Sequence, residues 1–355
     1  MHPGGVKTFC RSPTMTTLHP TPTDARTPRP DQPSEAEAAP AAHGPVGVAG
    51  LGAIGSTFVA RLVAAGRAVI AFDPQADRLA QAAAAGARPA ASLAELVAGA
   101  GVVVLCLPGS KQVERAVPAV LASVATGQLW INASTCHPET DERCAALIAA
   151  RGGAWVDAPL TWRPEGFVFM LGGEPEACAR AAAAVLDVVG ARSQRFGPTG
   201  TGQKCKLMQQ AITAAEKAVR LEVAALSRAL GLDPAWLRDY LGVPLSPALL
   251  EERPGAGATL GMMYKDLGYF LQVAHDARAA TPLLAAVREL FKTTLRVDDG
   301  TWSHDAIHAF YRMQHDQPLT VARARVAALE AVAPAEPASP AAPAPPPAPR
   351  VEAAP

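Results

Sequence analysis

Lys206 is the residue of this chain best suited to move a proton. It follows a glycine-rich turn at residues 200–202 and lies near the start of a stretch with helical periodicity, from about residue 204 to residue 230. The positive end of a helix dipole and partial burial both disfavour the ammonium form, so the pKa of this lysine is expected to fall. Such an amine exchanges protons near neutral pH, and Lys206 is therefore the predicted general acid/base.

Two other side chains bear on this assignment. Gln210 lies four residues after Lys206 and shares its helix face, where its amide is expected to hold either the amine or the substrate. Lys204 is a rival acid/base, but its offset of two residues directs it to another face of the helix. We therefore predict that Lys206 is catalytic and that Gln210 belongs to the substrate-binding set.

A second pattern, G-x-G-x-x-G at residues 50–55, lies between an apolar strand-like run and an apolar-faced helical segment. This order of strand, turn and helix is typical of dinucleotide binding. The first glycine permits a tight turn, the second leaves room for a pyrophosphate, and the third lets the helix pack closely on the sheet. The N–H groups that begin the helix then face the phosphates. The predicted cofactor-binding residues of this turn are Gly50, Gly52, Ala53, Ile54 and Gly55.

An acidic residue, Asp73, ends the next strand-like run, about twenty residues after the glycines. A carboxylate at this place accepts hydrogen bonds from the ribose hydroxyls of NAD and repels the 2'-phosphate of NADP. No arginine follows it directly, so the sequence favours NAD over NADP as the cofactor. Two alternatives remain open, namely that Asp73 only caps the next turn and that Arg78 swings towards a phosphate.

The composition is that of a globular chain of two domains. It has 355 residues, of which 49% are hydrophobic, and 32 basic residues balance 32 acidic ones. This neutrality gives no support to nucleic-acid or membrane binding. The 6 cysteines have no metal-binding or redox spacing and are expected to be reduced thiols of a cytoplasmic protein.

Both ends of the chain are rich in proline and alanine and poor in large apolar residues. We expect disordered tails at residues 1–44 and 331–355, because neither segment can bury enough surface to offset ordering entropy. The N-terminal tail lacks a continuous apolar stretch and carries several acidic residues, so neither a secretory signal nor a transit peptide is expected.

Between the tails, the pattern of elements changes once. Strand-like runs at residues 102–107, 129–132 and 154–157 alternate with helical stretches, which predicts a parallel sheet covered on both faces. After residue 202 the periodicity is helical, with segments near residues 204–230, 234–241, 260–275 and 282–295. The predicted fold class is α/β, with a Rossmann doubly wound parallel sheet at residues 45–200 followed by an all-α C-terminal domain at residues 201–330.

These motifs together resemble the β-hydroxyacid dehydrogenase family, the group of 3-hydroxyisobutyrate dehydrogenase and tartronate semialdehyde reductase. The likeness covers nearly everything between the tails. The motifs that carry it, in the family's order, are the turn at residues 50–55, Leu107-Pro108, Ser134-Thr135, the segment 157–161, the segment 200–210 and Lys265-Asp266-Leu267.

The resemblance implies roles for several of these residues. Leu107, Pro108 and Gln112 would line the cofactor, and Thr135 would contact its nicotinamide side. Lys206 would be the general acid/base, and Lys265 would reach the cofactor from the helical domain. The family's substrates are small 3-hydroxy acids or their semialdehydes, and its helical domain commonly pairs between subunits, so a homodimer or homotetramer is expected.

The chain departs from the family where the substrate should bind. A Ser-Gly-Gly that grips a carboxylate is replaced by Thr161, Trp162 and Arg163, and the loop that follows is several residues shorter. Our hypothesis is a small anionic substrate held by the Arg163 guanidinium, with Trp162 as an apolar wall and Thr161 beside them. The alternative has Arg163 in solvent and Trp162 packed against a neighbouring helix.

Other interpretations rest on single features. Gln209 and Gln210 replace asparagines of the family, which could reposition the substrate. An imine reductase is an alternative, but its relatives usually replace the lysine that is retained here as Lys206. A non-catalytic dinucleotide-binding sensor or assembly protein is a second alternative, against which the retention of Lys206 and Lys265 argues. His304 and His308 have a metal-compatible spacing, but no third ligand is apparent, so no metal is expected.

Overall fold

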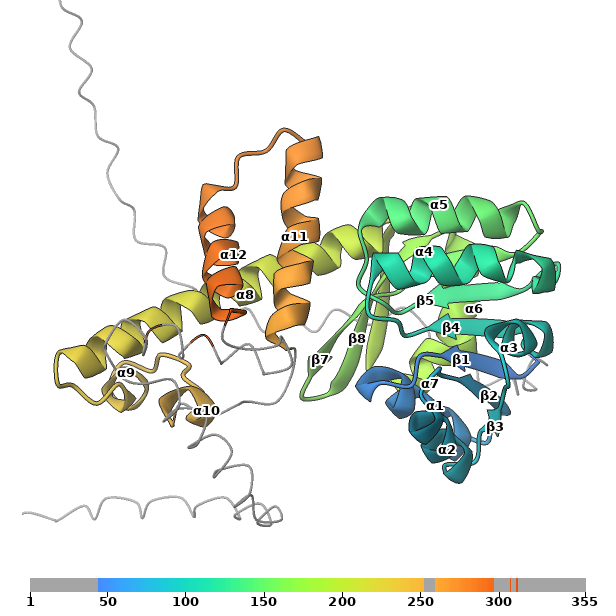
Figure 1. Cartoon of the computed structure of the whole chain (residues 1–355), viewed down its shortest axis with the longest axis horizontal. Coiled ribbons are helices and arrows are strands. Elements are labelled where there is room, and N and C mark those ends of the chain that lie inside the picture. The colour runs from blue at the N-terminus through green and yellow to red at the C-terminus, as the bar shows by residue number, and fades with distance from the viewer. Residues whose placement is uncertain (1–43, 252–258, 297–306, 308–310, 312–355) are drawn as a thin grey trace, which may run out of the picture. The chain divides into compact units, whose positions relative to one another are not determined.

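The computed structural model describes residues 44–251 and 259–296 and the single residues 307 and 311 (Figure 1). The predicted tails, apart from Gly44, lie outside the described residues, and so do His304 and His308.

A nine-stranded sheet forms the N-terminal half of the described chain. Its parallel part has the order β3-β2-β1-β4-β5-β6. From β1 the chain first adds β2 and β3 on one side, and it then crosses to the other side of β1 and adds β4, β5 and β6. This order is the one that places a ligand at the carboxyl ends of β1 and β4. The bounds of these strands are β1 Val46–Ala49, β2 Val69–Phe72, β3 Arg88–Pro89, β4 Val102–Leu105, β5 Leu129–Asn132 and β6 Ala154–Asp157.

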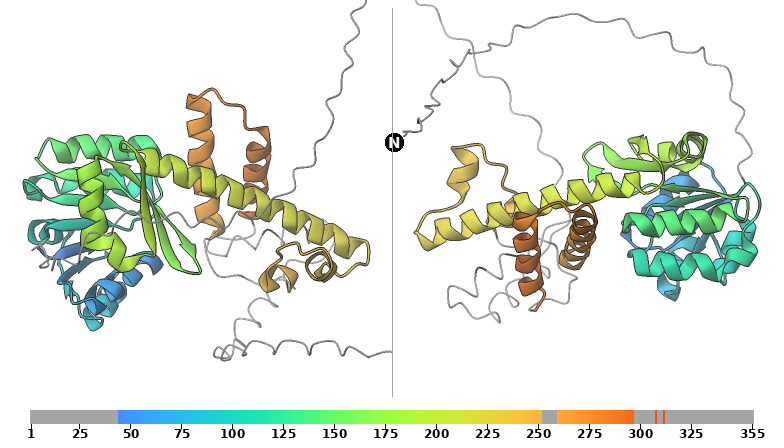
Figure 2. Two further views of the ribbon diagram at one scale, coloured as in Figure 1. Left: turned by 180° about the vertical axis from the view of Figure 1, so that it is seen from behind. Right: turned by 90° about the horizontal axis from the view of Figure 1, so that it is seen from above.

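Helices cover both faces of this sheet, as the sequence predicts (Figures 1 and 2). The central strands are runs of Val, Ile, Leu and Trp buried on both sides, which is typical of parallel sheets. One apolar core includes Phe58 of α1 and Val185, and the other includes Leu96 of α3 and Val113 of α4. The helices of this half are α1 Ala53–Ala64, α2 Ala76–Ala84, α3 Leu93–Gly99, α4 Ser110–Ala119, α5 Pro138–Ala149, α6 Pro175–Ala181 and α7 Asp187–Val189, with η1 Leu121–Ser123 and η2 Ala182–Leu186.

The segment predicted to be a substrate loop is instead a strand. β7, Leu160–Arg163, pairs antiparallel with β8, Gly166–Gly173, and the register joins Arg163 to Gly166 across a two-residue turn. On one edge of β8, Val168 pairs with β7 and Gly172 pairs with β6. On the other edge, both residues pair with β9, Arg192–Gly197. The shortened segment therefore extends the sheet, because the two residues between Arg163 and Gly166 leave room only for a tight hairpin.

Residues 201–296 are helical where they are described, as expected. The first helix, α8 Thr201–Ala229, is 29 residues long and packs on α11 and α12 around a third apolar core that includes Leu207, Leu267 and Phe291 (Figure 1). Among the described residues, no helix is both long and apolar enough to cross a membrane. The other helices are α9 Ala235–Asp239, α10 Pro247–Leu250, α11 Leu260–Asp276 and α12 Pro282–Thr294.

The three glycines of the turn between β1 and α1 differ in their surroundings. Gly50 has a φ of 91°, and a Cβ there would overlap the carbonyl oxygen of Cys106. A Cβ on Gly55 would overlap the carbonyl oxygen of Gly50. By contrast, a Cβ on Gly52 would meet no atom closer than Arg78 Nη1, at 4.0 Å. Gly50 and Gly55 are thus required by the fold, whereas Gly52 leaves open space above the turn.

This difference predicts separate effects for two alanine substitutions. Gly55→Ala should lower the Tm, because a methyl group forced into a packed contact costs about 1–3 kcal/mol. Gly52→Ala should leave the Tm unchanged but weaken NADH binding, since its methyl group fills the space for a pyrophosphate. Thermal unfolding and a fluorescence titration with NADH measure the two effects. Equal losses of Tm in both variants, or wild-type affinity in Gly52→Ala, would contradict this assignment.

Candidate active site

The turn before α1 and the end of β2 are tied together by one carboxylate. The N–H of Leu51 donates to Asp73 Oδ2 at 2.7 Å, and the N–H of Gln75 donates to Asp73 Oδ1 at 2.9 Å. Arg78 Nη1 lies 3.8 Å from Asp73 Oδ2. Asp73 therefore caps the following turn, as one alternative held, and also fixes the glycine turn. Each carboxylate oxygen has a second lone pair beyond the one that these N–H groups use.

The start of α1 fits a phosphate group. Gly52 is its N-cap and makes no side-chain cap, Ala53 is exposed and Ile54 is partly buried. The first N–H groups of a helix need an acceptor, and the open space over Gly52 gives a pyrophosphate access to them. The predicted residues of this turn are thus brought together with Asp73.

The loops after β4 and β5 form the next part of the same sheet edge. Ser134 Oγ accepts a hydrogen bond from the N–H of Leu107 at 2.9 Å and so joins the two loops. Lys265, on α11, donates from Nζ to the carbonyl oxygens of Pro108 at 2.8 Å and Thr135 at 2.9 Å. Lys265 thus reaches the loops predicted to line the cofactor. Gln112 lies further along α4 and is exposed.

Lys206 lies in the second turn of α8, and 5% of it is exposed. The pKa of its amine is lowered to about 8, mainly by burial and to a smaller extent by the nearby charges of Lys265 and Arg163. The carboxylate of Asp266 acts in the opposite direction. The predicted lowering of the pKa is present, with burial as its largest cause.

Gln209, rather than Gln210, contacts the amine of Lys206. Lys206 Nζ donates to Gln209 Oε1 at 3.0 Å. Gln210 turns to the neighbouring helix, where its Nε2 donates to Asp266 Oδ2 at 2.7 Å. The sequence reasoning considered the spacing of four residues and missed the spacing of three, which also places two side chains on one helix face.

Asp266 is a buried residue that sequence reasoning did not single out for a role. It is 1% exposed, accepts from Gln210, and places Oδ1 3.1 Å from Lys265 Nζ as an ion pair. Its charge therefore bears on both lysines of the site. Its place next to Lys265 in the Lys-Asp-Leu motif was the signal that could have identified it.

Thr161, Trp162 and Arg163 lie on β7, at the edge of the sheet order. The Trp162 ring packs edge-on against Phe167 of β8 with centroids 5.6 Å apart, while 61% of the residue remains exposed. This ring contact joins Trp162 to a strand of the sheet. Arg163 is exposed, yet its charge is close enough to lower the pKa of Lys206. Thr161 is partly buried beside them.

Beneath these groups lie two buried acids that the sequence reasoning did not assign. Asp157, the last residue of β6, accepts from the N–H groups of Gly200 at 2.8 Å and Gln203 at 3.0 Å, and burial raises its pKa to about 6. Asp141 accepts from Asn132 and Trp155, and burial together with the charge of Asp157 raises its pKa well above the usual value. Buried polar residues of this kind have no local pattern in a sequence.

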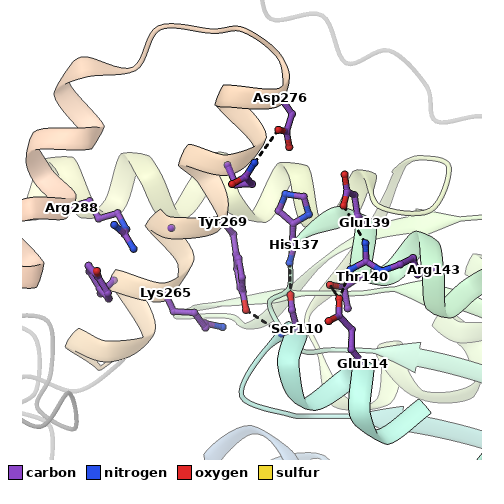
Figure 3. A pocket seen from close by; sticks show the side chains of 13 residues that line it. Ser110, Glu114, His137, Glu139, Thr140, Arg143, Lys265, Tyr269, Asp276 and Arg288 are labelled. Carbon is purple, nitrogen blue, oxygen red and sulfur yellow. Dashed lines mark hydrogen bonds and ion pairs between the residues drawn. The ribbon is translucent and has the colours of Figure 1, made fainter. Parts of the chain in front are cut away.

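A surface pocket of about 670 Å³ lies beside this site, between the first turns of α4 and α5 and the side of α11 (Figure 3). Tyr269 Oη accepts from the N–H of Ser110 at 3.1 Å, and Ser110 Oγ accepts from the N–H of His137 at 2.9 Å. Of the predicted site residues, only Lys265 lines this pocket. Among its acidic and basic side chains, Arg143 pairs with Glu114 and Glu139.

Comparison with known families divides the chain into two matched segments. Residues 45–200 match the NAD-binding domain of 6-phosphogluconate dehydrogenase. Residues 200–311 match the family described as the NAD-binding domain of NADP-dependent 3-hydroxyisobutyrate dehydrogenase. The chain thus carries NAD(P)-binding domains, and the matched descriptions name both NAD and NADP.

Individual relatives agree with these matches. The chain is 32% identical to 3-hydroxyisobutyrate dehydrogenase of Pseudomonas aeruginosa over 70% of its own length and 91% of that protein. It is 26% identical to 3-sulfolactaldehyde reductase of Escherichia coli, over 73% and 92%. The structure of 3-hydroxyisobutyrate dehydrogenase of Mycobacterium tuberculosis with L-serine is similar with a TM-score of 0.66, at 27% identity over 76% of this chain and 99% of that one. The chain therefore belongs to the β-hydroxyacid dehydrogenase family and is an NAD(P)-dependent oxidoreductase.

Proposed function

We propose that the protein is an NAD-dependent oxidoreductase that interconverts a small anionic 3-hydroxy acid and its semialdehyde or keto form. The observation that carries this proposal is the buried Lys206, whose amine has a pKa of about 8. Its helix, α8, is joined to the loop after β5 by the hydrogen bonds of Gln203. Membership in a family of enzymes favours catalysis over the alternative of a non-catalytic dinucleotide-binding protein.

The loops at the carboxyl ends of β1, β2, β4 and β5 support a dinucleotide bound over the glycine turn at residues 50–55. The start of α1 would hold the pyrophosphate and Asp73 the ribose hydroxyls, while Leu107, Pro108 and Thr135 would line the nicotinamide, which exchanges hydride when it is bound. The buried carboxylate of Asp73 favours NAD, because it would repel a 2'-phosphate. Arg78 lies close enough to offset part of this repulsion, so activity assays should compare NADH with NADPH.

Lys206 would move the proton of the reacting oxygen. In oxidation the neutral amine takes the proton of the substrate hydroxyl, and in reduction the ammonium group returns it to the oxygen. Gln209 orients the amine by its hydrogen bond. A pKa of about 8 makes both protonation states available near neutral pH.

This role predicts opposite pH profiles for the two directions. Because oxidation needs the neutral amine, kcat/KM for the hydroxy acid should rise as the pH passes through about 8. Reduction needs the ammonium form and should decline over the same range. Lys206→Ala should lose about 10²–10⁴-fold of activity in both directions, the usual contribution of a general acid/base. The measurement is the initial rate between pH 6.5 and pH 10 with NAD(H) and NADP(H).

The matched control is Lys204→Ala, which removes an exposed lysine of the same helix that faces Glu142. It should keep the wild-type rates and pH profiles. Equal losses in the two variants, or a wild-type enzyme whose rates in both directions do not vary across pH 8, would rule out Lys206 as the acid/base.

The substrate side favours an anion held by a side chain rather than by backbone N–H groups. The two glycines whose bare backbone grips the substrate in the family are replaced here by Trp162 and Arg163, and part of the backbone of β7 is used in its ladder with β8. Arg163 offers a guanidinium near Lys206, and Trp162 adjoins it as an exposed apolar surface. The names of the relatives fit this proposal, because 3-hydroxyisobutyrate and 3-sulfolactaldehyde both carry an anionic group near the reacting carbon.

Arg163→Ala should reduce kcat/KM for the anionic substrate by about 10- to 100-fold, since a charge-assisted hydrogen bond contributes about 1.5–3 kcal/mol. The loss should appear mainly in KM. The pKa of Lys206 should also rise, because the charge of Arg163 lowers it, and the midpoint of the oxidation profile should move to higher pH. Arg192→Ala, on β9 at the other edge of β8, is the control and should change neither quantity. An unchanged kcat/KM in Arg163→Ala would mean that Arg163 serves only as a solvated surface residue.

A homodimer or larger homo-oligomer is the state that α8 favours. Ile212, Val219 and Leu226 are exposed and repeat at intervals of seven residues, and Val223 and Leu230 are exposed beside them. Such an apolar stripe on a helix is typical of a helix–helix interface. We propose that it pairs with the same stripe of a second copy.

The double substitution Ile212→Asp and Leu226→Asp should convert the assembly to monomers, because it places charges within an apolar interface. Light scattering coupled to size-exclusion chromatography measures the mass. The control is Leu147→Asp, which adds a charge at an exposed leucine of α5 and should leave the mass unchanged. A monomeric wild type, or an unchanged mass of the double variant, would refute this interface.

A further inference from the structure

Gln203 connects the catalytic helix to the loop after β5. Its Oε1 accepts from the N–H of Cys136 at 3.0 Å, and its Nε2 donates to the carbonyl oxygen of Ser134 at 2.9 Å. The side chain is fully buried, at 0% exposure. One side-chain amide thus makes hydrogen bonds to the backbone of both residues that flank Thr135.

Gln203 lies on the same helix as Lys206, so its hydrogen bonds to the loop bear on where the Lys206 amine lies. Gln203 lies three residues before Lys206, so the two side chains emerge on the same face of α8. Thr135, between the two bonded residues, also accepts a hydrogen bond from Lys265. Gln203 therefore spans the gap between the helix that carries the amine and the loop proposed to face the nicotinamide.

Only a side chain with both an acceptor and a donor satisfies the two loop groups at once. An amide provides a carbonyl for the N–H of Cys136 and an NH₂ group for the carbonyl of Ser134. The backbone N–H of Gln203 is held in turn by Asp157 Oδ2. The glutamine is thus fixed at its backbone by the sheet and at its side chain by the loop.

The surroundings leave this arrangement little freedom. A Cβ on Gly202 would lie 2.7 Å from Asp157 Oδ2, and a Cβ on Gly172 would lie 2.5 Å from Asp157 Oδ1, so the helix start and β8 approach the carboxylate as closely as glycine allows. A shift of the helix relative to the loop would break several buried hydrogen bonds together.

We infer that Gln203 is a positioning residue that sets the placement of the Lys206 amine relative to the loop 134–136. This inference rests on the proposed role of Lys206 as the acid/base. It assigns to Gln203 no contact with the substrate, and its effect therefore belongs to the rate of the chemical step rather than to cofactor affinity.

Gln128 provides a matched control for the loss of a buried amide. Its Nε2 donates to the carbonyl oxygens of Val97 and Ala100, both at 2.7 Å, and its Oε1 accepts from Trp130 Nε1 at 3.0 Å. It precedes β5, at the opposite end of that strand from Ser134. Gln128→Met and Gln203→Met therefore remove comparable networks, one remote from Lys206 and one beside it.

Gln203→Met should lower kcat on the order of 10- to 100-fold, the size of effect that a misplacement of about 1 Å produces. The Kd for NADH should change less than about threefold, because the helix start at α1 and Asp73 supply most of that binding. The midpoint of the Lys206 titration, followed by NMR of lysine labelled with ¹³C at Cε, should move away from about 8. Gln128→Met should lower the Tm at least as much but leave kcat and the titration at wild-type values.

Gln203→Glu tests the donor to Ser134 by its pH dependence. Burial and the nearby carboxyl groups of Asp157 and Asp141 should raise the pKa of the new acid. When protonated, it can still accept from Cys136 and donate to Ser134. When ionised, it faces the carbonyl oxygen without a proton. The ratio of the variant's kcat for reduction to that of the wild type at the same pH should therefore rise as the pH falls from 8 to 6.5, a range that stays above the Asp157 pKa of about 6. Taking the ratio removes the titration of Lys206 itself, which affects both enzymes near pH 8.

The outcomes separate this inference from the proposed function. If the wild type reduces no aldehyde or keto acid, the proposed function fails, while a moved Lys206 titration in Gln203→Met still supports the positioning role. If the wild type is active, equal kinetics and titrations for Gln203→Met and Gln128→Met would overturn the inference. A pH profile of Gln203→Glu that parallels the wild type would overturn it as well.

Discussion

The carboxylate of Asp157 is the contact on which the geometry of the site depends. It ends β6 and accepts from the N–H groups of Gly200 and Gln203, so the sheet holds the start of the helix that carries Lys206. An acid at a helix N-terminus is stabilised by the helix dipole and by the unpaired N–H groups. Because two glycines bring backbone to within contact of this carboxylate, the strand, the hairpin and the helix are fixed at one point.

The second constraint is electrostatic. Lys206 is buried and close to the positive charges of Lys265 and Arg163, and the carboxylate of Asp266 opposes their effect on its pKa. Asp266 forms an ion pair with Lys265 of α11 and accepts a hydrogen bond from Gln210 of α8, so one buried acid contacts side chains of both helices. Without that acid, burial and two like charges would favour the neutral amine far more strongly, and proton donation at neutral pH would become difficult.

Local patterns were sufficient to predict the α/β sheet, the glycine turn, the long helix at Lys206 and most of the helices after it. They were insufficient for β7, because its Thr-Trp-Arg was interpreted through the family's loop, and for β9, whose residues are mostly polar and exposed. The roles of Gln203, Gln209 and Asp266 also escaped prediction. Gln209 contacts Lys206 within α8, at a helical spacing of three that was overlooked. Gln203 and Asp266 owe their roles to contacts between α8, the loop after β5 and α11, and a sequence of one chain carries no period for such contacts.

The hairpin of β7 and β8 means that the backbone on the proposed substrate side of the site is already ordered before a substrate binds. A flexible loop would have to lose backbone freedom when a substrate binds, at a cost of about 1–2 kcal/mol for each residue that becomes ordered. Here residues 160–163 are already held by β8, which is itself paired with β6 and β9. If Arg163 holds the substrate as proposed, the substrate would bind against a preformed wall, and at residues 160–163 affinity would depend on side-chain complementarity rather than on ordering of the backbone.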